Sequence, residues 1–391
     1  MGDDYDDWGH PIEPRFKARD QTFLGALKTY YILVTRRYRT LFATILFAIC
    51  LLLYWNTTDS SSRAPPVDWK SFAYVQYVTD NHNLCNAYMV FEALHRHGSK
   101  ADRVLLYPDT WDLEDDTPTD RNSQLLIRAQ KLYSVKLKPV SLLSIEGPNA
   151  SPGTLNAPSS WSTSITKLRA FELVEYDRVL HLDSDITLLQ NLDDLFLLPP
   201  TPIAMPRAYW SEEKPQPLTS LLMLLEPNPL ELKNFLDILQ SWKLAPNFQA
   251  GRNYDMDLLN HRFAHSALVL PHRPYAMLSA EFRSHDHKPY MGSLNAPRDT
   301  YSKYDWDAQR QYAEAKLVHF SDWPLPKPWV MWPHEGVAEM QPDCGGEATH
   351  CMEREIWKGL YDDFRHRRKD LCRILSVPAP KWDDIKNGTK A

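Results

Sequence analysis

The sequence predicts an α/β fold with a mostly parallel sheet flanked by helices. From residue 69 onward, segments typical of buried strands alternate with segments typical of helices, which is the pattern of a parallel sheet. The composition agrees, because 391 residues with 43% hydrophobic content can bury one large core or two modest ones. A disordered or fibrous protein is therefore excluded.

The predicted elements follow one another regularly in the first part of this region. The expected strands cover 72–78, 104–107, 135–140 and 179–182, and the expected helices cover 84–96, 123–133 and 164–176. Asp120 is expected to cap the second of these helices. A loop rich in Pro, Ser and Asn occupies 146–162. The second half is less regular, with strands expected at 221–225 and 267–270 and helices at 229–242 and 255–263.

Residues 41–55 form an uncharged apolar stretch that directly follows a cluster of arginines. We interpret residues 40–56 as a transmembrane signal anchor, and the alternatives are a buried core helix and a cleaved signal peptide. The stretch is apolar all round and lacks a clear cleavage site, which favours the span. The excess of Lys and Arg before it predicts a type II orientation. The predicted domains are a cytosolic tail (1–39), the anchor (40–56), a stem (57–70) and a single lumenal domain (71–391).

Two further features agree with a lumenal domain. Glycosylation sequons begin at Asn56, Asn149 and Asn387. Four cysteines follow the predicted span, namely Cys85, Cys344, Cys351 and Cys372. Four thiols allow three pairings, and the sequence leaves the choice open, although the second and third flank a Gly-Gly turn and could bridge locally.

The charge distribution gives no reason to expect a nucleic acid partner. The formal net charge is −6, and no basic stripe occurs. The basic run over 365–369 is interpreted as a solvated helix face. Sugars, nucleotides and metal ions remain the candidate ligands.

Asp183 and Asp185 follow the buried strand over 179–182 and are the first candidates for a functional site. Side chains alternate across a strand, so two acids spaced i and i+2 can converge on one ion where the strand ends. Ligands of open α/β sheets gather at the carboxyl ends of strands, and carboxylate oxygens suit Mg²⁺ and Mn²⁺. An isolated Asp-x-Asp is more often a solvated turn, but this position favours a divalent cation site.

Two enzyme classes use acids in this arrangement. In a haloacid-dehalogenase-type phosphatase, Asp183 would be the nucleophile, Asp185 an acid/base, and Thr187 would complete the motif. In a metal-dependent glycosyltransferase, both acids would hold a cation against the diphosphate of a nucleotide sugar. Three β/α units precede the acids, and no later strand ends in an acidic pair, so the transferase is favoured.

Five segments resemble, in order, the glycogenin-like glycosyltransferase family 8, and within it the fungal Golgi α-N-acetylglucosaminyltransferases. They are YVTD at 77–80, WSTSITKL at 161–168, YDRVLHLDSDI at 176–186, YDMDLLN at 254–260 and LVHFSDWPLPKPW at 317–329. The resemblance implies a GT-A-type, Rossmann-like mixed sheet flanked by helices. It also implies transfer from a nucleotide sugar with retention of the anomeric configuration.

The residue types at these positions suit that chemistry. Asp183, Asp185 and His319 offer two oxygens and one nitrogen, a set that favours Mn²⁺, with Mg²⁺ as the second choice. Lys167 and Lys327 could offset the charge that builds on a departing diphosphate.

The resemblance also implies residues that bind the donor. Thr79, Asp80 and Tyr88 would hold the base and ribose, and Ser184, between the two acids, is expected to contact the donor as well.

The implied catalytic residues are Asp255, Asp257 and Lys167. Two departures from the family pattern concern the sugar end of the site. Met256 replaces a glutamine of the family, and Thr219 stands where the family has an asparagine.

We therefore expect a type II Golgi membrane protein that moves N-acetylglucosamine from UDP-GlcNAc to mannose on a glycan. Its expected partners are the nucleotide sugar, a mannose-containing acceptor and the membrane through 40–56, with Mn²⁺ or Mg²⁺ as cofactor. An inactive lumenal glycan-binding protein of the same fold is the remaining alternative, because Met256 lacks the amide of the family. The donor sugar, acceptor and linkage are not decided by the sequence.

Overall fold

The computed structural model describes most of the chain, which forms two compact units, 1–67 and 68–391. The described residues are 23–59, 66–111, 113, 120–145, 162–245, 254–292, 306–322, 325–345, 350–378 and 381–386. The sequons at Asn149 and Asn387, the loop over 146–161 and parts of the tail and stem lie outside these ranges.

In the described part of the first unit, the helix α1 (Phe23–Asp59) covers the predicted anchor. Among the described residues, no helix combines the length and the apolar character needed to cross a membrane. The span over 40–56 therefore stays a prediction.

The second unit is built on a seven-stranded sheet in the order β3-β2-β1-β4-β7-β6-β8. The strands are β1 (Phe72–Tyr77), β2 (Asp102–Pro108), β3 (Val135–Val140), β4 (Arg178–Leu182), β6 (Ile203–Pro206), β7 (Leu222–Leu225) and β8 (Leu268–Leu270). The first four are parallel, whereas β7 runs antiparallel to both β4 and β6. The sheet is thus mixed, and the α/β class is confirmed.

A smaller sheet begins directly after Asp185. It has the order β5-β10-β9 and consists of β5 (Ile186–Leu188), β9 (Met277–Leu278) and β10 (Leu317–His319). The strand β10 runs antiparallel to β5 and parallel to β9. The sequence did not predict these strands, because two or three residues are too few to show a period of two.

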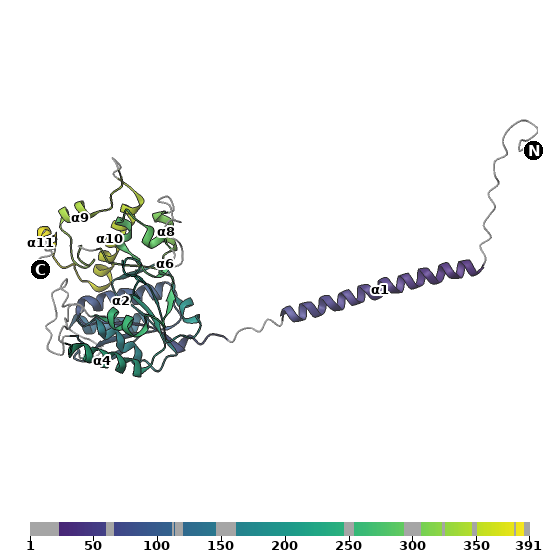
Figure 1. Ribbon diagram of the computed structural model, residues 1–391, viewed down its shortest axis with the longest axis horizontal. Helices are drawn as coiled ribbons and strands as arrows, with labels where there is room; N and C mark the ends of the chain where they lie inside the picture. Colours follow the sequence, from purple (N-terminus) through teal and green to yellow (C-terminus); the bar gives the residue numbers. More distant parts are fainter. Residues whose placement is uncertain are drawn as a thin grey trace, which may run out of the picture. The chain divides into compact units, whose positions relative to one another are not determined.

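Helices cover both faces of the large sheet, and Figure 1 labels α2 and α4 beside its strands. The helices are α2 (Asn81–Arg96), α3 (Arg121–Tyr133), α4 (Pro229–Lys243), α5 (Asp255–Phe263), α6 (His272–Tyr275), α7 (Lys288–Met291), α8 (Ala308–Glu314), α9 (His334–Met340), α10 (Met352–Cys372) and α11 (Trp382–Lys386). The short 3₁₀ helices are η1 (Trp69–Ser71), η3 (Ser164–Glu172), η4 (Asp193–Leu197) and η6 (Ser279–Arg283). Asp120 caps α3 as predicted, accepting from the Ser123 amide at 3.0 Å.

The segment expected to be an α-helix over 164–176 is instead the 3₁₀ helix η3. Its early residues Ile165 and Thr166 are β-branched, which disfavours an α-helix. The hydroxyl of Thr166 also bonds to both backbone groups of Leu143, which fixes the segment against the chain that follows β3.

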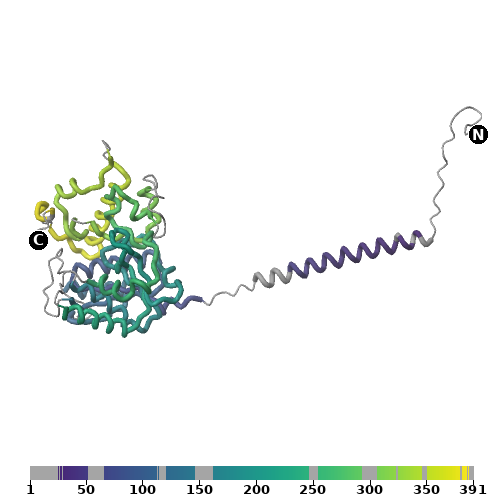
Figure 2. The backbone as a smooth tube through the Cα atoms, in the orientation of Figure 1, coloured from purple at the N-terminus to yellow at the C-terminus, as the bar shows by residue number. Residues whose placement is uncertain are grey.

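Alternation along the strands divides the core between the two faces of the sheet. Tyr74 packs into the cluster that includes α2, α3 and α10, whereas Val75 packs into the cluster with η3, α4 and α5. The C-terminal segment, yellow in Figure 2, contributes to the first cluster through Trp357 and Phe364 of α10.

Two disulfides join the four cysteines of this unit. Cys344 bonds to Cys351, as the Gly-Gly turn allowed, and Cys85 on α2 bonds to Cys372 at the end of α10. On α1, Cys50 is free and exposed.

The interpretation of 365–369 as a solvated helix face is wrong for Arg368, which is 0% exposed. Residues four apart share one side of a helix, so Arg368 lies on the same side as Phe364 and Cys372, which are both buried. A basic run in a sequence does not reveal that one of its members faces inward.

A buried carboxylate ties the C-terminal helix to the small sheet. Asp322 follows β10 and accepts hydrogen bonds from Ser279 Oγ at 2.5 Å and Trp357 Nε1 at 3.3 Å. It also accepts one from the Tyr361 hydroxyl and forms an ion pair with Arg283 at 3.0 Å.

We predict that Asp322→Ala lowers the free energy of unfolding by about 3–5 kcal/mol, because Arg283 and three hydrogen-bond donors then lose their buried partner. Urea-induced unfolding measures this change. The control is Asp362→Ala, since Asp362 is exposed on α10 and pairs with Arg365 only at 3.6 Å. Equal losses in both variants would contradict the role assigned to Asp322.

Candidate functional site

The two acids lie in the connection between the large and the small sheet. Leu182 at the end of β4 pairs with Leu222 of β7, and the Asp183 amide donates to the Leu221 carbonyl at 2.8 Å. The Asp185 carbonyl accepts from the Phe320 amide at 2.9 Å, directly after β10. Each acid is thus fixed by a different sheet.

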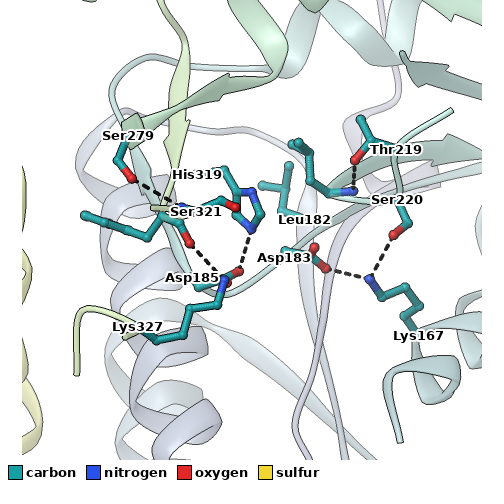
Figure 3. Close-up of polar contacts among 12 residues, drawn as sticks. Lys167, Leu182, Asp183, Asp185, Thr219, Ser220, Ser279, His319, Ser321 and Lys327 are labelled. Carbon is teal, nitrogen blue, oxygen red and sulfur yellow. Dashed lines mark hydrogen bonds and ion pairs between the residues drawn. The ribbon is translucent and has the colours of Figure 1, made fainter. Parts of the chain in front are cut away.

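The structure brings the three predicted metal ligands together. One potential ligand atom from each of Asp183, Asp185 and His319 lies within 4.8 Å of the other two. His319 Nε2 is 3.3 Å from Asp185 Oδ1, and Figure 3 shows the ring directed at that carboxylate. Neighbouring ligands on an octahedral cation lie about 3 Å apart, and the spacing of His319 Nε2 and Asp185 Oδ1 is close to this value.

Lys167 lies on the other side of Asp183 and is 4% exposed. Its ammonium is 2.8 Å from Asp183 Oδ1 and 2.9 Å from Asp255 Oδ2, and it donates to Ser220 Oγ at 3.3 Å. Burial by itself lowers the pKa of Lys167, but the two carboxylates raise it well above its ordinary value. Lys167 therefore remains charged and bridges two acids that are far apart in the sequence.

Asp255, the first residue of α5, is held by both of its oxygens. It accepts from Ser164 Oγ at 2.6 Å and from Ser220 Oγ at 2.5 Å. Burial alone would raise its pKa, but Lys167 and these hydroxyls outweigh burial and lower the pKa to about 2. Asp255 is thus a fully engaged counter-ion of Lys167.

Asp257 is not brought to this cluster. It is exposed on α5, and its carboxylate accepts from the Tyr254 amide at 2.7 Å in a capping box. Of the two acids predicted to be catalytic, only Asp255 lies at the site.

Lys327 neutralises the second acid. Its ammonium donates to Asp185 Oδ2 at 2.6 Å and to the Phe320 carbonyl at 2.8 Å. Burial by itself would raise the pKa of Asp185. Lys327 and then His319 lower this pKa by more than burial raises it, so the pKa of Asp185 is well below its usual range. The pKa of Asp183 is raised instead, because burial and the nearby Asp185 outweigh Lys167.

Thr79 and Asp80, predicted to hold the nucleotide, follow β1, which is parallel to β4 and adjacent to it. They therefore lie at the same edge of the sheet as the acids. Asp80 caps α2 by accepting from the amides of His82 at 2.8 Å and Asn83 at 2.9 Å. The Asn83 amide group also donates to Thr79 Oγ1 at 3.2 Å, which fixes both predicted contacts in one turn.

The two other predicted donor contacts differ. Ser184 is half-buried between the acids, at the site. Tyr88 is 1% exposed, and its ring packs against Tyr133 at 5.1 Å, so no surface of Tyr88 is open to a ligand.

Sequence reasoning missed the residues that support Lys167. Ser164 lies inside one of the segments singled out by the resemblance, and Ser220 directly follows Thr219, but a serine carries no periodic signal. Tyr77 packs 5.9 Å from the Lys167 ammonium, and burial, opposed by Lys167, raises its pKa. The ring of Tyr77 in turn contacts His181 at 5.6 Å, and burial together with Lys167 lowers the pKa of this fully buried histidine.

Comparisons with known proteins place the chain among transferases. No protein-family model matches it. Glucose N-acetyltransferase 1 of Aspergillus fumigatus is 44% identical over 359 residues, which are 88% of this chain and 90% of the relative. Glucose N-acetyltransferase 1 of Gibberella zeae is 44% identical over 321 residues, covering 81% of this chain and 66% of the relative. The solved structure of the galactosyltransferase LgtC with donor and acceptor sugar analogs is 17% identical, with a TM-score of 0.44 over 74% of this chain and 99% of that chain.

The chain is therefore a glycosyltransferase. The Aspergillus fumigatus relative matches 88% of this chain, so the family likeness covers most of its length. The chain belongs to the glucose N-acetyltransferase 1 family, which confirms the branch indicated by the sequence resemblance.

We predict that Asp255→Asn lowers the free energy of unfolding by about 2 kcal/mol at pH 7, because the carboxyl pKa of about 2 lies below its ordinary 3.8. A lowered carboxyl pKa stabilises the fold above the unfolded pKa, and this stability is lost as the pH falls through the folded pKa. The deficit of the variant should therefore shrink to about half at pH 3. Urea-induced unfolding at the two pH values tests it.

The control for this measurement is Asp237→Asn, which removes an exposed carboxylate on α4 that pairs with Lys233. Its effect should stay below about 0.5 kcal/mol at both pH values. A deficit in Asp255→Asn that does not change with pH would contradict the charge-based explanation.

Proposed function

We propose that the chain transfers N-acetylglucosamine from UDP-GlcNAc to a mannose residue of a glycan, with retention of the anomeric configuration and with the help of a divalent cation. The observation that carries the proposal is the approach of Asp183, Asp185 and His319 at the sheet edge, between Lys167 and Lys327. The name glucose N-acetyltransferase 1 of the relatives supports the donor sugar, and the family resemblance supports retention and the mannose acceptor.

The donor set supports Mn²⁺, with Mg²⁺ as the second choice, because it combines two carboxylates with one imidazole. A bound divalent cation supplies positive charge that neutralises the diphosphate of the donor. The buried Nδ1 of His319 has no hydrogen-bond partner among the described residues, so no protein contact restrains the ring through this atom.

The two lysines contribute differently. The side chain of Lys327 is 26% exposed, against 4% for Lys167, so Lys327 is the cation that can move onto an oxygen of the departing diphosphate. Lys167 is held by two carboxylates and acts as a fixed positive charge beside Asp183. Fixed charges stabilise developing negative charge without having to reorganise during the reaction.

Bond breaking occurs between the anomeric carbon and the phosphate oxygen, and UDP leaves with both electrons. The acceptor oxygen forms the new bond to the anomeric carbon, and its proton passes to the phosphate oxygen of the departing UDP. Asp255 is engaged with Lys167 and two serine hydroxyls, so we assign it to the support of Lys167 rather than to attack on the sugar.

We also propose that residues 40–56 anchor the chain in the Golgi membrane with the catalytic unit in the lumen. Two disulfides support an oxidising compartment, and the arginines before the apolar stretch support the orientation. Carbonate extraction and protease protection of the tagged chain test this, and release by carbonate would contradict it.

We predict that chelation with EDTA abolishes transfer from UDP-GlcNAc to a mannose-terminated acceptor and that Mn²⁺ restores it. Asp185→Asn should lower kcat/KM by about 10²–10³-fold, because it removes a ligand atom and the partner of Lys327. Release of UDP measures the rate.

The matched control is Asp194→Asn, which removes an exposed acid that pairs with Lys316 and with none of the residues of this cluster among those that the structure describes. Its rate should stay within about twofold of the unmodified chain. Full activity in EDTA would refute the metal dependence. If the chain turns over UDP-glucose or UDP-galactose but not UDP-GlcNAc, the proposed donor is wrong and the proposed class of reaction stands.

A further inference from the structure

The proposed donor site is assembled from two segments that are far apart in the sequence. The nucleotide end is the turn of Thr79 and Asp80 at the start of α2, and the metal end includes His319 and Lys327. Neither segment is continuous with the other, so their spacing must be set by elements that contact both.

The helix α10 contacts both segments. Phe320, next to His319, packs against the rings of Tyr361 and Phe364 at 4.9 Å each. One and two turns further along α10, Arg368 and Cys372 reach α2. A single rigid helix thus joins the metal end of the site to the nucleotide end.

Arg368 contacts the first turns of α2. Its guanidinium donates to the carbonyl of His82 at 3.2 Å and to the side-chain oxygen of Asn86, and it lies 3.4 Å from His82 Nδ1. His82 is also one of the residues whose amide is capped by Asp80. Arg368 therefore acts on the same turn that presents Thr79 and Asp80.

The cost of placing Arg368 there argues against a purely stabilising role. Burial lowers the pKa of Arg368 to about 10, with Asp80 opposing the shift. Arg368 forms no ion pair within the part of the chain that the structure describes. A buried charge without a paired carboxylate is a weak source of stability. The planar guanidinium of an arginine, however, holds its hydrogen-bond acceptors in a fixed relative position.

We propose that Arg368 and the Cys85–Cys372 disulfide are positioning residues that hold the first turn of α2 at the correct distance from the metal ligands, so that the uridine and the diphosphate of one donor are bound together. The inference rests on the proposed function, and it concerns how the nucleotide end of that site is held. None of the three metal ligands lies on α2, so metal binding alone does not depend on this contact.

The neighbouring Arg367 provides a matched control. It lies on the same helix but donates to the Met89 carbonyl at 2.9 Å and to Glu92, further along α2 than the turn held by Arg368. Loss of either arginine weakens the packing of α10 on α2, but only loss of Arg368 frees the start of α2.

The test compares Arg368→Met, Arg368→Lys and Arg367→Met by titration calorimetry with UDP in the presence of Mn²⁺. We expect Arg368→Met to raise the Kd for UDP at least tenfold, Arg368→Lys to raise it less, and Arg367→Met to change it less than threefold. Binding of Mn²⁺ alone should change less than twofold in all three. Hydrogen exchange of the amides over 81–86 without ligand should be faster in Arg368→Met only.

The two disulfides allow a second comparison. The double variant Cys85→Ala/Cys372→Ala removes the disulfide between α2 and α10. The double variant Cys344→Ala/Cys351→Ala removes a disulfide that does not involve α2 and that reaches α10 only at its N-cap, Cys351. We expect a fivefold or larger rise in the UDP Kd for the first pair and less than a twofold rise for the second. This pair of variants keeps the test decisive if Arg368→Met does not fold.

The outcomes separate this inference from the function on which it rests. If the unmodified chain does not bind UDP, the proposed function is overturned. If the unmodified chain binds UDP and Arg368→Met or the first cysteine pair binds it equally well, this inference alone is overturned. Equal losses in Arg367→Met and Arg368→Met would likewise overturn it, because they would show a general effect of helix packing.

Discussion

The ion pairs of Lys167 are the interaction on which the rest of the site depends. Asp183 comes from the end of β4 and Asp255 from the start of α5, and the single ammonium between them joins these elements. A buried carboxylate without a partner would take up a proton or move out to solvent. The position of Asp183 therefore requires the ammonium of Lys167. Across the cluster, three carboxylates face two ammonium groups, which leaves one negative charge uncompensated. A bound divalent cation would compensate this remaining negative charge.

The topology of the two sheets brings these charges to one edge. Parallel β1 and β4 end side by side, which places the turn of Asp80 beside the acids. The antiparallel strand β7 begins at the same edge, so Ser220, just before it, reaches Lys167 and Asp255. In the small sheet, His319 is opposite Ile186, one residue beyond Asp185, and this register brings the imidazole to the carboxylate. Parallel and antiparallel pairings therefore contribute different members of one cluster.

Local patterns predicted the parts of this arrangement that are continuous in the sequence. The strands β1 to β4 and the helix α5 have strong periodicity or clear ends, and Asp183, Asp185 and His319 were identified because their neighbours form recognisable segments. The pairing of Lys167 with Asp255 and the burial of Arg368 were not predictable, since each depends on contacts between segments far apart in the chain. Tyr88 is a different case: the resemblance assigned it to the donor, and the structure places it on the inner face of α2, buried against Tyr133. The remaining short strands have too few residues to show any period.

The opposite pKa shifts of the two neighbouring acids show where the fold gives up stability for the site. Asp185 has a lowered pKa, so its charge stabilises the fold at every pH above its unfolded value. Asp183 has a raised pKa, so its charge costs free energy above the folded pKa, mainly because the carboxylate is buried and lies near Asp185. A cation shared by both carboxylates would relieve that cost, and the relief would appear as binding free energy.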